Sequence, residues 1–192
     1  MQQSRHNKTT PVLYVFFGMI ATGKSTLSQG WAWHKQLPCY NSDWVRKELA
    51  GITPTESQRE TIDAGIYSNE FSQKTYSILL KRAEAKLKRG ESVILDASYQ
   101  YKQDREDIKA LARKLHCQVY FILCQCSEKE MKLRMDEREN DPAAVSDGRW
   151  EIYLKQKKRF EPPDELQASE LIPIDTQASL EELLDELDDK LQ

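Results

Sequence analysis

The chain has 192 residues, of which 39% are hydrophobic and 31% are charged, a balance typical of a soluble globular domain. Its 28 Lys and Arg against 31 Asp and Glu give a net charge of −3, so a broad basic face for long nucleic acid is not expected. No stretch approaches the roughly 20 apolar residues of a membrane span, and the N-terminus has no apolar signal core. We therefore expect a cytoplasmic protein with a flexible polar tail over residues 1–10 and a single domain over residues 11–192.

Strands and helices are predicted to alternate along the whole chain. Apolar runs predict five strands, at residues 12–17, 38–41, 92–95, 118–123 and 171–174. Helical spacing and capping residues predict helices at 24–36, 42–50, 64–89, 104–115, 127–139, 149–160 and 179–191. Ser42 or Asp43 is the expected N-cap of the second helix. This order predicts an α/β fold with a mainly five-stranded parallel sheet, helices on both faces, and a ligand at the carboxyl ends of the strands.

The first strand runs into a stretch that fits the P-loop pattern G-x-x-x-x-G-K-[ST] at every required position. Glycines allow the backbone to approach a phosphate closely, and the N–H groups at the start of the next helix favour an anion. Lys24 would reach the outer phosphates and Ser25 would ligate Mg²⁺. The predicted ATP-binding residues in this loop are Gly18, Met19, Ile20, Ala21, Thr22, Gly23, Lys24, Ser25 and Thr26.

Two acidic positions follow later strands at the same edge of the predicted sheet. Asp43 and Arg46 are neighbours on a helix, where a carboxylate can take a proton from a substrate hydroxyl and an arginine can hold an anionic group. The alternative is that Asp43 only caps its helix and Arg46 is a surface charge. Asp96 ends an apolar strand at the Walker-B type of position, where a carboxylate reaches magnesium. The alternative there is a carboxylate that caps a turn.

Arg134 and Arg138 share one helix face just before a stretch rich in helix breakers, residues 140–148. A mobile lid that begins with arginine would exclude water and neutralise charge during phosphoryl transfer. The alternative is a solvated helix with charges four residues apart.

With these motifs in place, the chain resembles the small P-loop kinases of the nucleoside-monophosphate-kinase-like group. In particular, it is similar to a bacterial kinase family that also occurs fused behind aminoglycoside-phosphotransferase-like domains. The resemblance covers nearly the whole chain and is carried by the arginine pair and by the segments GMIATGKST, NSDWVRKELAG, GESVILDASY and YLKQKKRFEPP. Related kinases act on gluconate, adenylylsulfate, chloramphenicol or the 5′-hydroxyl of polynucleotides.

The resemblance implies a role for each matching residue. Asp43 would be the general base on the acceptor hydroxyl, and Arg46 would bind the acceptor. Arg138 would contact the phosphates from the lid, and Arg134 would stack near adenine. The chain departs from several relatives in having Ser98 where they have threonine, and in lacking an arginine within residues 140–148, so Arg149 or Arg134 is the remaining candidate to assist Arg138.

The sequence therefore predicts a kinase that uses ATP and Mg²⁺ to phosphorylate a hydroxyl of a small-molecule acceptor. One alternative is a polynucleotide 5′-hydroxyl kinase with the same machinery and a larger acceptor. The alternative outside enzymes is an ATP-binding switch module. No obligate protein partner is predicted.

Overall fold

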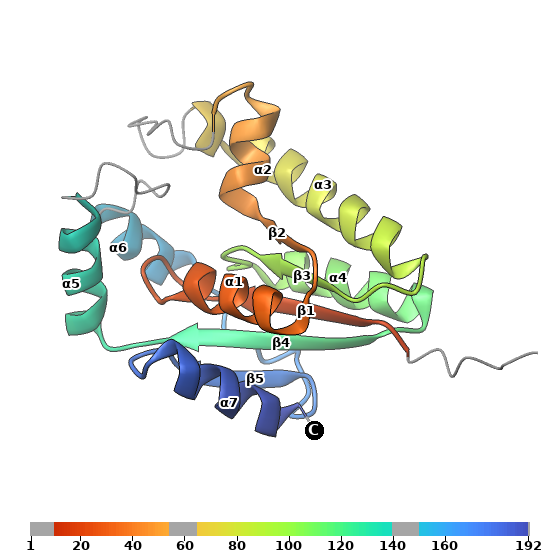
Figure 1. The fold of residues 1–192 in the computed structure, drawn as a ribbon. Helices are drawn as coiled ribbons and strands as arrows, with labels where there is room; N and C mark the ends of the chain where they lie inside the picture. The colour runs from red at the N-terminus through yellow and green to blue at the C-terminus, as the bar shows by residue number, and fades with distance from the viewer. Residues whose placement is uncertain (1–9, 54–64, 140–149, 192) are drawn as a thin grey trace, which may run out of the picture.

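The computed structural model describes residues 10–53, 65–139 and 150–191, which form a five-stranded parallel sheet between helices (Figure 1). The strands are β1 (Val12–Phe17), β2 (Cys39–Asn41), β3 (Val93–Asp96), β4 (Gln118–Gln125) and β5 (Leu171–Asp175). Their order across the sheet is β2-β3-β1-β4-β5, with every neighbouring pair parallel. The predicted α/β class and the parallel sheet are confirmed.

The helices follow the predicted order, with one correction. They are α1 (Lys24–Lys35), α2 (Ser42–Leu49), α3 (Asn69–Leu87), α4 (Lys102–Leu115), α5 (Glu128–Glu139), α6 (Trp150–Arg159) and α7 (Leu180–Lys190). The single helix predicted over residues 64–89 is wrong at its start, because a 3-10 turn, η1 (Gly65–Tyr67), precedes α3. Ser68 has extended backbone and its hydroxyl accepts a hydrogen bond from the Phe71 N–H at 3.3 Å, so the helix begins after it.

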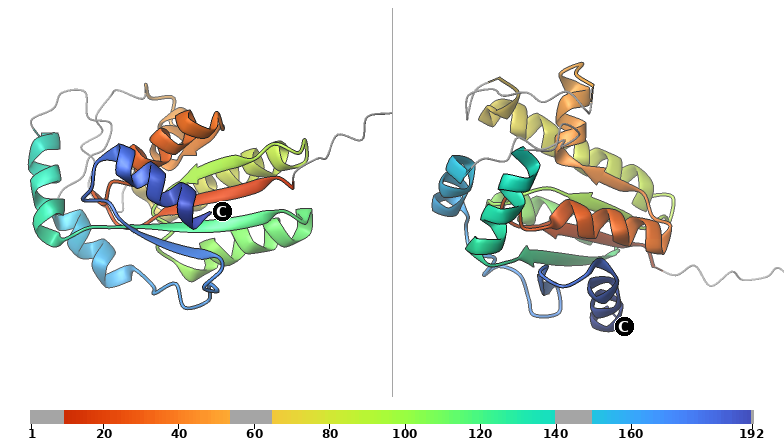
Figure 2. Two further views of the ribbon diagram at one scale, coloured as in Figure 1. Left: turned by 60° about the horizontal axis from the view of Figure 1, so that its bottom comes forward. Right: turned by 60° about the vertical axis from the view of Figure 1, so that its left-hand side comes forward.

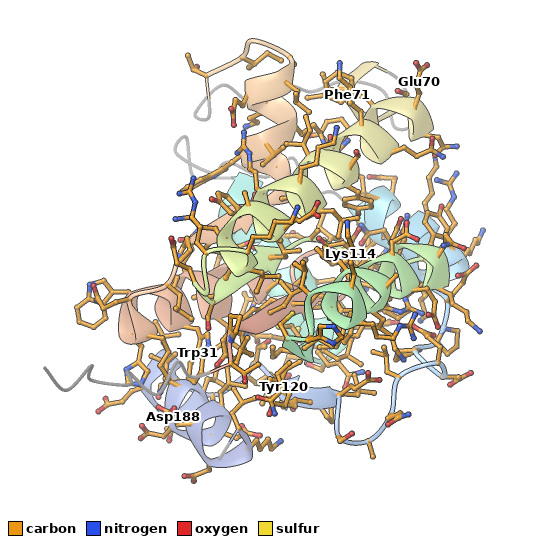
Figure 3. The ribbon with its side chains drawn as sticks, turned by 90° about the vertical axis from the view of Figure 1, so that its right-hand side faces the viewer. Trp31, Glu70, Phe71, Lys114, Tyr120 and Asp188 are labelled. Atoms are coloured by element: carbon orange, nitrogen blue, oxygen red, sulfur yellow. The ribbon has the colours of Figure 1, made fainter. Side chains whose placement is uncertain are left out.

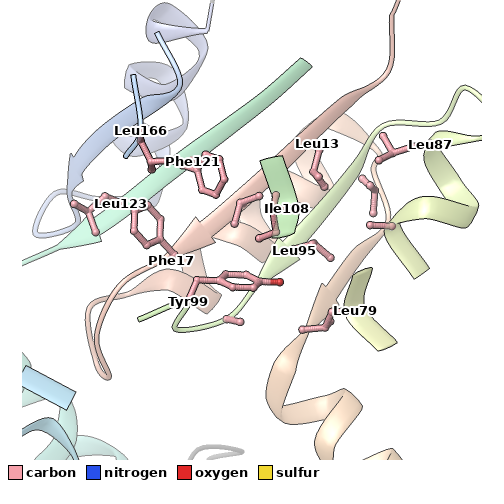
Figure 4. Packing of buried hydrophobic residues seen from close by; sticks show 14 of the residues in the cluster. Leu13, Phe17, Leu79, Leu87, Leu95, Tyr99, Ile108, Phe121, Leu123 and Leu166 are labelled. Carbon is pink, nitrogen blue, oxygen red and sulfur yellow. The ribbon is translucent and has the colours of Figure 1, made fainter. Parts of the chain in front are cut away.

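Each face of the sheet is covered by a pair of helices, as the views in Figure 2 show. On one face, α3 and α4 pack on alternate residues of β1 and β3 (Figure 4); the buried residues there include Leu13, Val15, Phe17, Leu79, Leu95, Ile108 and Phe121. On the other face, α1 and α7 pack on a second cluster that includes Phe16, Leu27, Trp31, Ile94, Ile122, Ile174 and Leu187. Because strand residues alternate between faces, both faces of β1 are apolar.

The contact between α1 and α7 closes the second face. In Figure 3, Trp31 of α1 and Asp188 of α7 lie close to each other, with Tyr120 of β4 nearby. The Tyr14 ring meets the Trp31 ring edge-on at 6.0 Å between centroids, and His34 Nε2 of α1 lies 2.7 Å from Asp188 Oδ2. α7 is therefore held to α1 by polar as well as apolar contacts.

A third, smaller apolar cluster lies beyond the carboxyl ends of the strands, where α5 and α6 stand at one end of the sheet (Figure 1). Its buried members are Ala21, Met131, Met135 and Tyr153, and the side chains of Met19 and Ile20 pack against them. The tip of the loop after β1 thus rests on α5 and α6. Among the helices that the structure describes, none combines the length and the apolar character needed to cross a membrane.

Candidate nucleotide-binding site

The loop between β1 and α1 has backbone geometry that requires its two glycines. Gly18 has φ +138°, and a Cβ there would lie 2.4 Å from the Cys124 carbonyl oxygen of β4. Gly23 has φ +78° and is the N-cap of α1. The first turn of α1 therefore presents its free N–H groups at the edge of the sheet where the loop lies, the arrangement that binds phosphate.

The side chains of the loop are held close to it. Lys24 Nζ donates to the Met19 carbonyl oxygen at 2.9 Å, and the Thr22 hydroxyl donates to the same oxygen at 2.7 Å. Ala21 has φ +59°, an uncommon conformation for a residue with a Cβ. Lys24 lies where an anion bound by the loop would meet it, and moving its ammonium from one carbonyl oxygen to a phosphate exchanges a neutral partner for a charged one.

A buried carboxylate lies beside the loop at the end of β3. Asp96 Oδ2 accepts hydrogen bonds from the Ser28 hydroxyl at 3.1 Å and from Asn41 Nδ2 at 2.7 Å. Asn41 Nδ2 also lies 3.3 Å from the Ser25 hydroxyl oxygen, so one amide joins the two predicted magnesium ligands. Asp96 Oδ1 is buried and has no hydrogen-bond partner in the described part of the chain. A free carboxylate oxygen and a nearby hydroxyl suit Mg²⁺, which binds oxygen and keeps several of its waters.

Asn41, and not Ser42 or Asp43, is the N-cap of α2, so the predicted cap is wrong. The Asn41 Oδ1 atom accepts from the Asp43 N–H at 2.8 Å and from the Trp44 N–H at 3.1 Å. Asn41 ends β2 with extended backbone, which is the conformation that a cap needs. Asparagine is one of the residues preferred at helix N-caps, so this cap could have been identified from the sequence.

Asp43 is therefore free of the capping role that was its alternative assignment. Its carboxyl is half-buried, and burial is the main cause that raises its pKa, while the charges of Arg46 and Lys24 act in the opposite direction. The charges of Lys24 and Asp96 both act on the pKa of Asp43, so this carboxyl lies within electrostatic range of the P-loop and the candidate metal site.

Arg46 is buried and makes its contacts within the protein. Its Nη1 atom donates to the Ile66 carbonyl oxygen at 2.7 Å and to the Ser72 hydroxyl at 3.1 Å, and its guanidinium lies over the Tyr67 ring. These contacts tie α2 to η1 and α3. Arg46 Nε is buried without a partner among the described residues.

Arg134 connects α5 to the turn after β5. Its Nη2 donates to the Thr176 carbonyl oxygen at 2.6 Å, its Nη1 to the Thr176 hydroxyl at 3.1 Å, and its Nε to Glu130 at 2.8 Å. The Thr176 hydroxyl in turn donates to the Thr22 carbonyl oxygen of the P-loop at 2.8 Å. The Arg138 side chain and the predicted lid, residues 140–148, lie outside what the structure describes.

A cavity of about 330 Å³ opens between the P-loop and the ends of β4 and β5. It is lined by Gly18, Met19, Thr22, Leu123, Cys124, Gln125, Cys126, Met131 and Asp175. Cys124 lies in its wall, and burial raises the pKa of this thiol to about 12, so it stays protonated. The cavity is next to the Arg134–Thr176 contact and has the mixed polar and apolar lining of a small-molecule site.

Two further groups near the site were not predicted from the sequence. The Tyr76 hydroxyl of α3 lies 2.9 Å from the Ser98 hydroxyl just after β3, and the Tyr76 ring stacks on that of Tyr99. The Ile20 N–H of the P-loop donates to Gln156 Oε1 of α6 at 2.7 Å. Each contact joins elements that are distant in sequence, so neither leaves a local pattern.

The fold and this loop define a P-loop nucleotide-binding protein. Residues 13–163, more than three quarters of the chain, match the family model described as an AAA domain. The chain belongs to this family.

Relatives that are similar in sequence align with only part of this chain. A stretch of 121 residues, 63% of this chain, is 30% identical to uncharacterized proteins of Mycobacterium tuberculosis and Mycobacterium bovis. The match takes up 24% of the length of those relatives, so the matched part of the chain spans about a quarter of each.

Solved structures of P-loop kinases have the same fold. A gluconokinase from Sinorhizobium meliloti 1021 is similar with a TM-score of 0.65 and 18% identity, over 95% of this chain and 91% of that one. An APS kinase of Mycobacterium tuberculosis, solved with AMPPNP and APS, is similar with a TM-score of 0.65 and 15% identity, over 94% and 96% of the two chains. A Chloroflexus aurantiacus J-10-fl protein reaches a TM-score of 0.70 at 23% identity, over 96% and 100%. The architecture is therefore that of a P-loop kinase.

Proposed function

We propose that this chain is an ATP- and magnesium-dependent kinase that transfers the γ-phosphate of ATP to a hydroxyl of a small-molecule acceptor. The observation that carries the proposal is Asp43, a half-buried carboxyl in the first turn of α2, within electrostatic range of Lys24, that does not cap its helix. A protein that only binds and releases nucleotide needs no such group beside its phosphate site. The gluconokinase, sugar kinase and APS kinase among the similar structures support a small acceptor.

The proposed chemistry assigns one task to each group. The P-loop N–H groups and Lys24 bind the phosphates, and Ser25 and Asp96 would hold the magnesium ion, which supplies charge neutralisation when bound. Asp43 accepts the proton of the acceptor hydroxyl as that oxygen bonds to the γ-phosphorus and the bond to the ADP oxygen breaks. Its raised pKa makes it a stronger base than an exposed aspartate.

The remaining predicted residues complete the proposal. Arg138 contacts the phosphates from the lid over residues 140–148, and Arg134 lies against the adenine. Arg46 contributes to the acceptor side chiefly through its bonds to Ile66 and Ser72, which hold η1 and α3 beside α2. The acceptor would then lie between Asp43 and the Tyr76–Ser98 pair.

The test is a screen of ATP consumption over sugars, antibiotics, nucleosides and 5′-hydroxyl oligonucleotides, followed by the Asp43→Asn variant on the best acceptor. We expect a kcat lower by roughly a hundred- to ten-thousandfold, with ATP affinity by calorimetry within a few-fold of wild type. Asparagine keeps the size of the side chain and removes only the base. Lys24→Ala, which removes the phosphate contact, is the control that should lose ATP affinity as well.

An unchanged kcat for Asp43→Asn would refute the role of Asp43 as base. If no acceptor raises ATP consumption above its rate without acceptor, the proposal of a small-molecule kinase fails. If only oligonucleotides do so, the larger-acceptor alternative takes its place.

A further inference from the structure

Gln156 of α6 contacts the P-loop but has no role in the function proposed above. Gln156 lies on α6, 136 residues from Ile20, and its Oε1 accepts the Ile20 N–H at 2.7 Å. A backbone N–H can only donate, so the side-chain atom that it meets must be the oxygen, and the orientation of the amide follows from chemistry. The Gln156 Nε2 group therefore points away from this bond and stays close to the loop.

The Gln156 amide nitrogen is available to a ligand. It donates to no described residue, and it is not fully buried, since Gln156 is a partly exposed residue. Ile20 lies between Gly18 and Lys24 in the loop that wraps around the phosphates. An N–H₂ group held there adds donors where an anion binds, next to those of the loop itself.

Contacts on both sides of Gln156 hold α6 in this position. Three residues before Gln156, Tyr153 is buried at 1% exposure against Ala21 and Met131, and its hydroxyl donates to Glu128 at 2.6 Å. Four residues after it, the Phe160 ring stacks on Phe17 at the end of β1, with 6.4 Å between centroids. Gln156 is thus fixed from both sides, which is what a group that must meet a ligand at a set distance requires.

We infer that Gln156 binds the terminal phosphate of ATP. Its oxygen holds the Ile20 N–H and so the shape of the loop, while its amide N–H₂ donates to the γ-phosphate. ADP lacks that phosphate, so Gln156 should favour ATP over ADP. The inference rests on the proposed function only in taking ATP as the nucleotide.

The test measures binding alone, by calorimetry of Mg²⁺ with AMPPNP and with ADP, on wild type and two variants. Gln156→Leu removes the donor, and we expect AMPPNP affinity to fall roughly ten- to a hundredfold, as for one hydrogen bond to a charged group, with ADP affinity within about threefold. Gln156→Glu can still accept the Ile20 N–H but sets a negative charge beside the γ-phosphate. It should lose AMPPNP affinity at least as strongly as Gln156→Leu.

The matched control is Gln118→Leu, the same change at an exposed residue that begins β4, at the opposite end of the sheet. It should leave both affinities unchanged. If Gln156 only pins α6 to the loop, Gln156→Glu binds both nucleotides as wild type does and Gln156→Leu loses both equally; either result overturns the inference. A protein that discriminates AMPPNP from ADP through Gln156 but phosphorylates no acceptor would refute the proposed function alone.

Discussion

Asp104, in the first turn of α4, is an acidic side chain whose surroundings disfavour its charge. Its Oδ2 atom is buried without a partner in the described part of the chain. Burial, and then the nearby charge of Asp107, raises the pKa of Asp104 to about 6, although Arg105 acts in the opposite direction. The ordinary value for such a carboxyl is 3.8, so the folded protein binds a proton here that the unfolded chain releases at lower pH.

This predicts a pH dependence of stability that Asp104→Asn removes. Between about pH 4 and pH 6 the folded state holds more protons than the unfolded state, so this residue makes stability fall as pH rises through that window. Asparagine stays neutral throughout. The variant should be more stable than wild type at pH 7, by on the order of 1 kcal/mol after allowance for solvent screening, and the difference should vanish below pH 4.

Urea unfolding at a series of pH values from 4 to 8 measures this difference. The control is Asp189→Asn, the same change at an exposed position of α7. A constant difference between Asp104→Asn and wild type over the whole range would contradict the raised pKa.

At the scale of elements, one arginine joins α4 to the segment that follows α6. Arg105 is fully buried and pairs with Glu165, whose side chain is 4% exposed. Its other donors reach the carbonyl oxygens of Tyr99 at 2.9 Å, Glu161 at 3.1 Å and Pro162 at 3.2 Å. One guanidinium therefore bonds both the loop after β3 and the chain after α6, in addition to the bond from the Glu161 N–H to the Gln100 carbonyl oxygen.

Replacement of one partner of this pair should be far more costly than replacement of both. Arg105→Met leaves a buried carboxylate without its cation, and we expect a loss of about 3–5 kcal/mol in the free energy of unfolding. The double variant Arg105→Met with Glu165→Met should recover much of that loss, because neither charge is then buried alone.

Chemical denaturation of the two variants, with Arg113→Met as the control on the same helix, checks this prediction. Arg113 is 67% exposed and its ion pair with Glu106 spans 3.8 Å, so its replacement should change stability by less than about 0.5 kcal/mol. Arg105→Met and Arg113→Met of equal stability would show that the buried network does not hold these elements.

In the whole molecule, the residues that stabilise the fold and those expected to bind the ligand lie in different places. The two apolar clusters lie on the faces of the sheet, and the candidate site lies at the carboxyl ends of the strands, as in other open parallel sheets. The small apolar cluster under the tip of the P-loop is the place where core packing meets the candidate site. A cavity made far from that point should therefore reduce stability and leave the site intact.

Leu187→Ala tests this separation. Leu187 of α7 is fully buried against α1 and the sheet, and removal of its side chain should cost about 2–5 kcal/mol. AMPPNP affinity measured well below the melting temperature should stay within about twofold. Leu133→Ala on α5, where the side chain is 52% exposed, is the matched control and should lose little stability. A large loss of nucleotide affinity in Leu187→Ala would show that the face and the site are coupled.

The elements that depend on neighbouring residues in the chain could be predicted from the sequence. The P-loop, the alternation of strands and helices, and the parallel sheet follow from residue spacing and from Gly18 and Gly23, whose positive φ angles are a local feature of the loop. The position of Asp96 at the end of a buried strand is local in the same sense. At residues 64–89, where the sequence predicted one helix, the capping hydroxyl of Ser68 sets a later start for α3.

Which side chains meet could be seen only in the tertiary structure. Asn41 caps α2 and also bonds Asp96, 55 residues away. Asparagine at this position therefore serves both the helix and the candidate site. Arg46 turns inward to Ile66, and Gln156 reaches Ile20, because strand order and helix packing bring these segments together. Such contacts depend on the path of the whole chain through space, and a periodicity read over a few residues carries no information about that path.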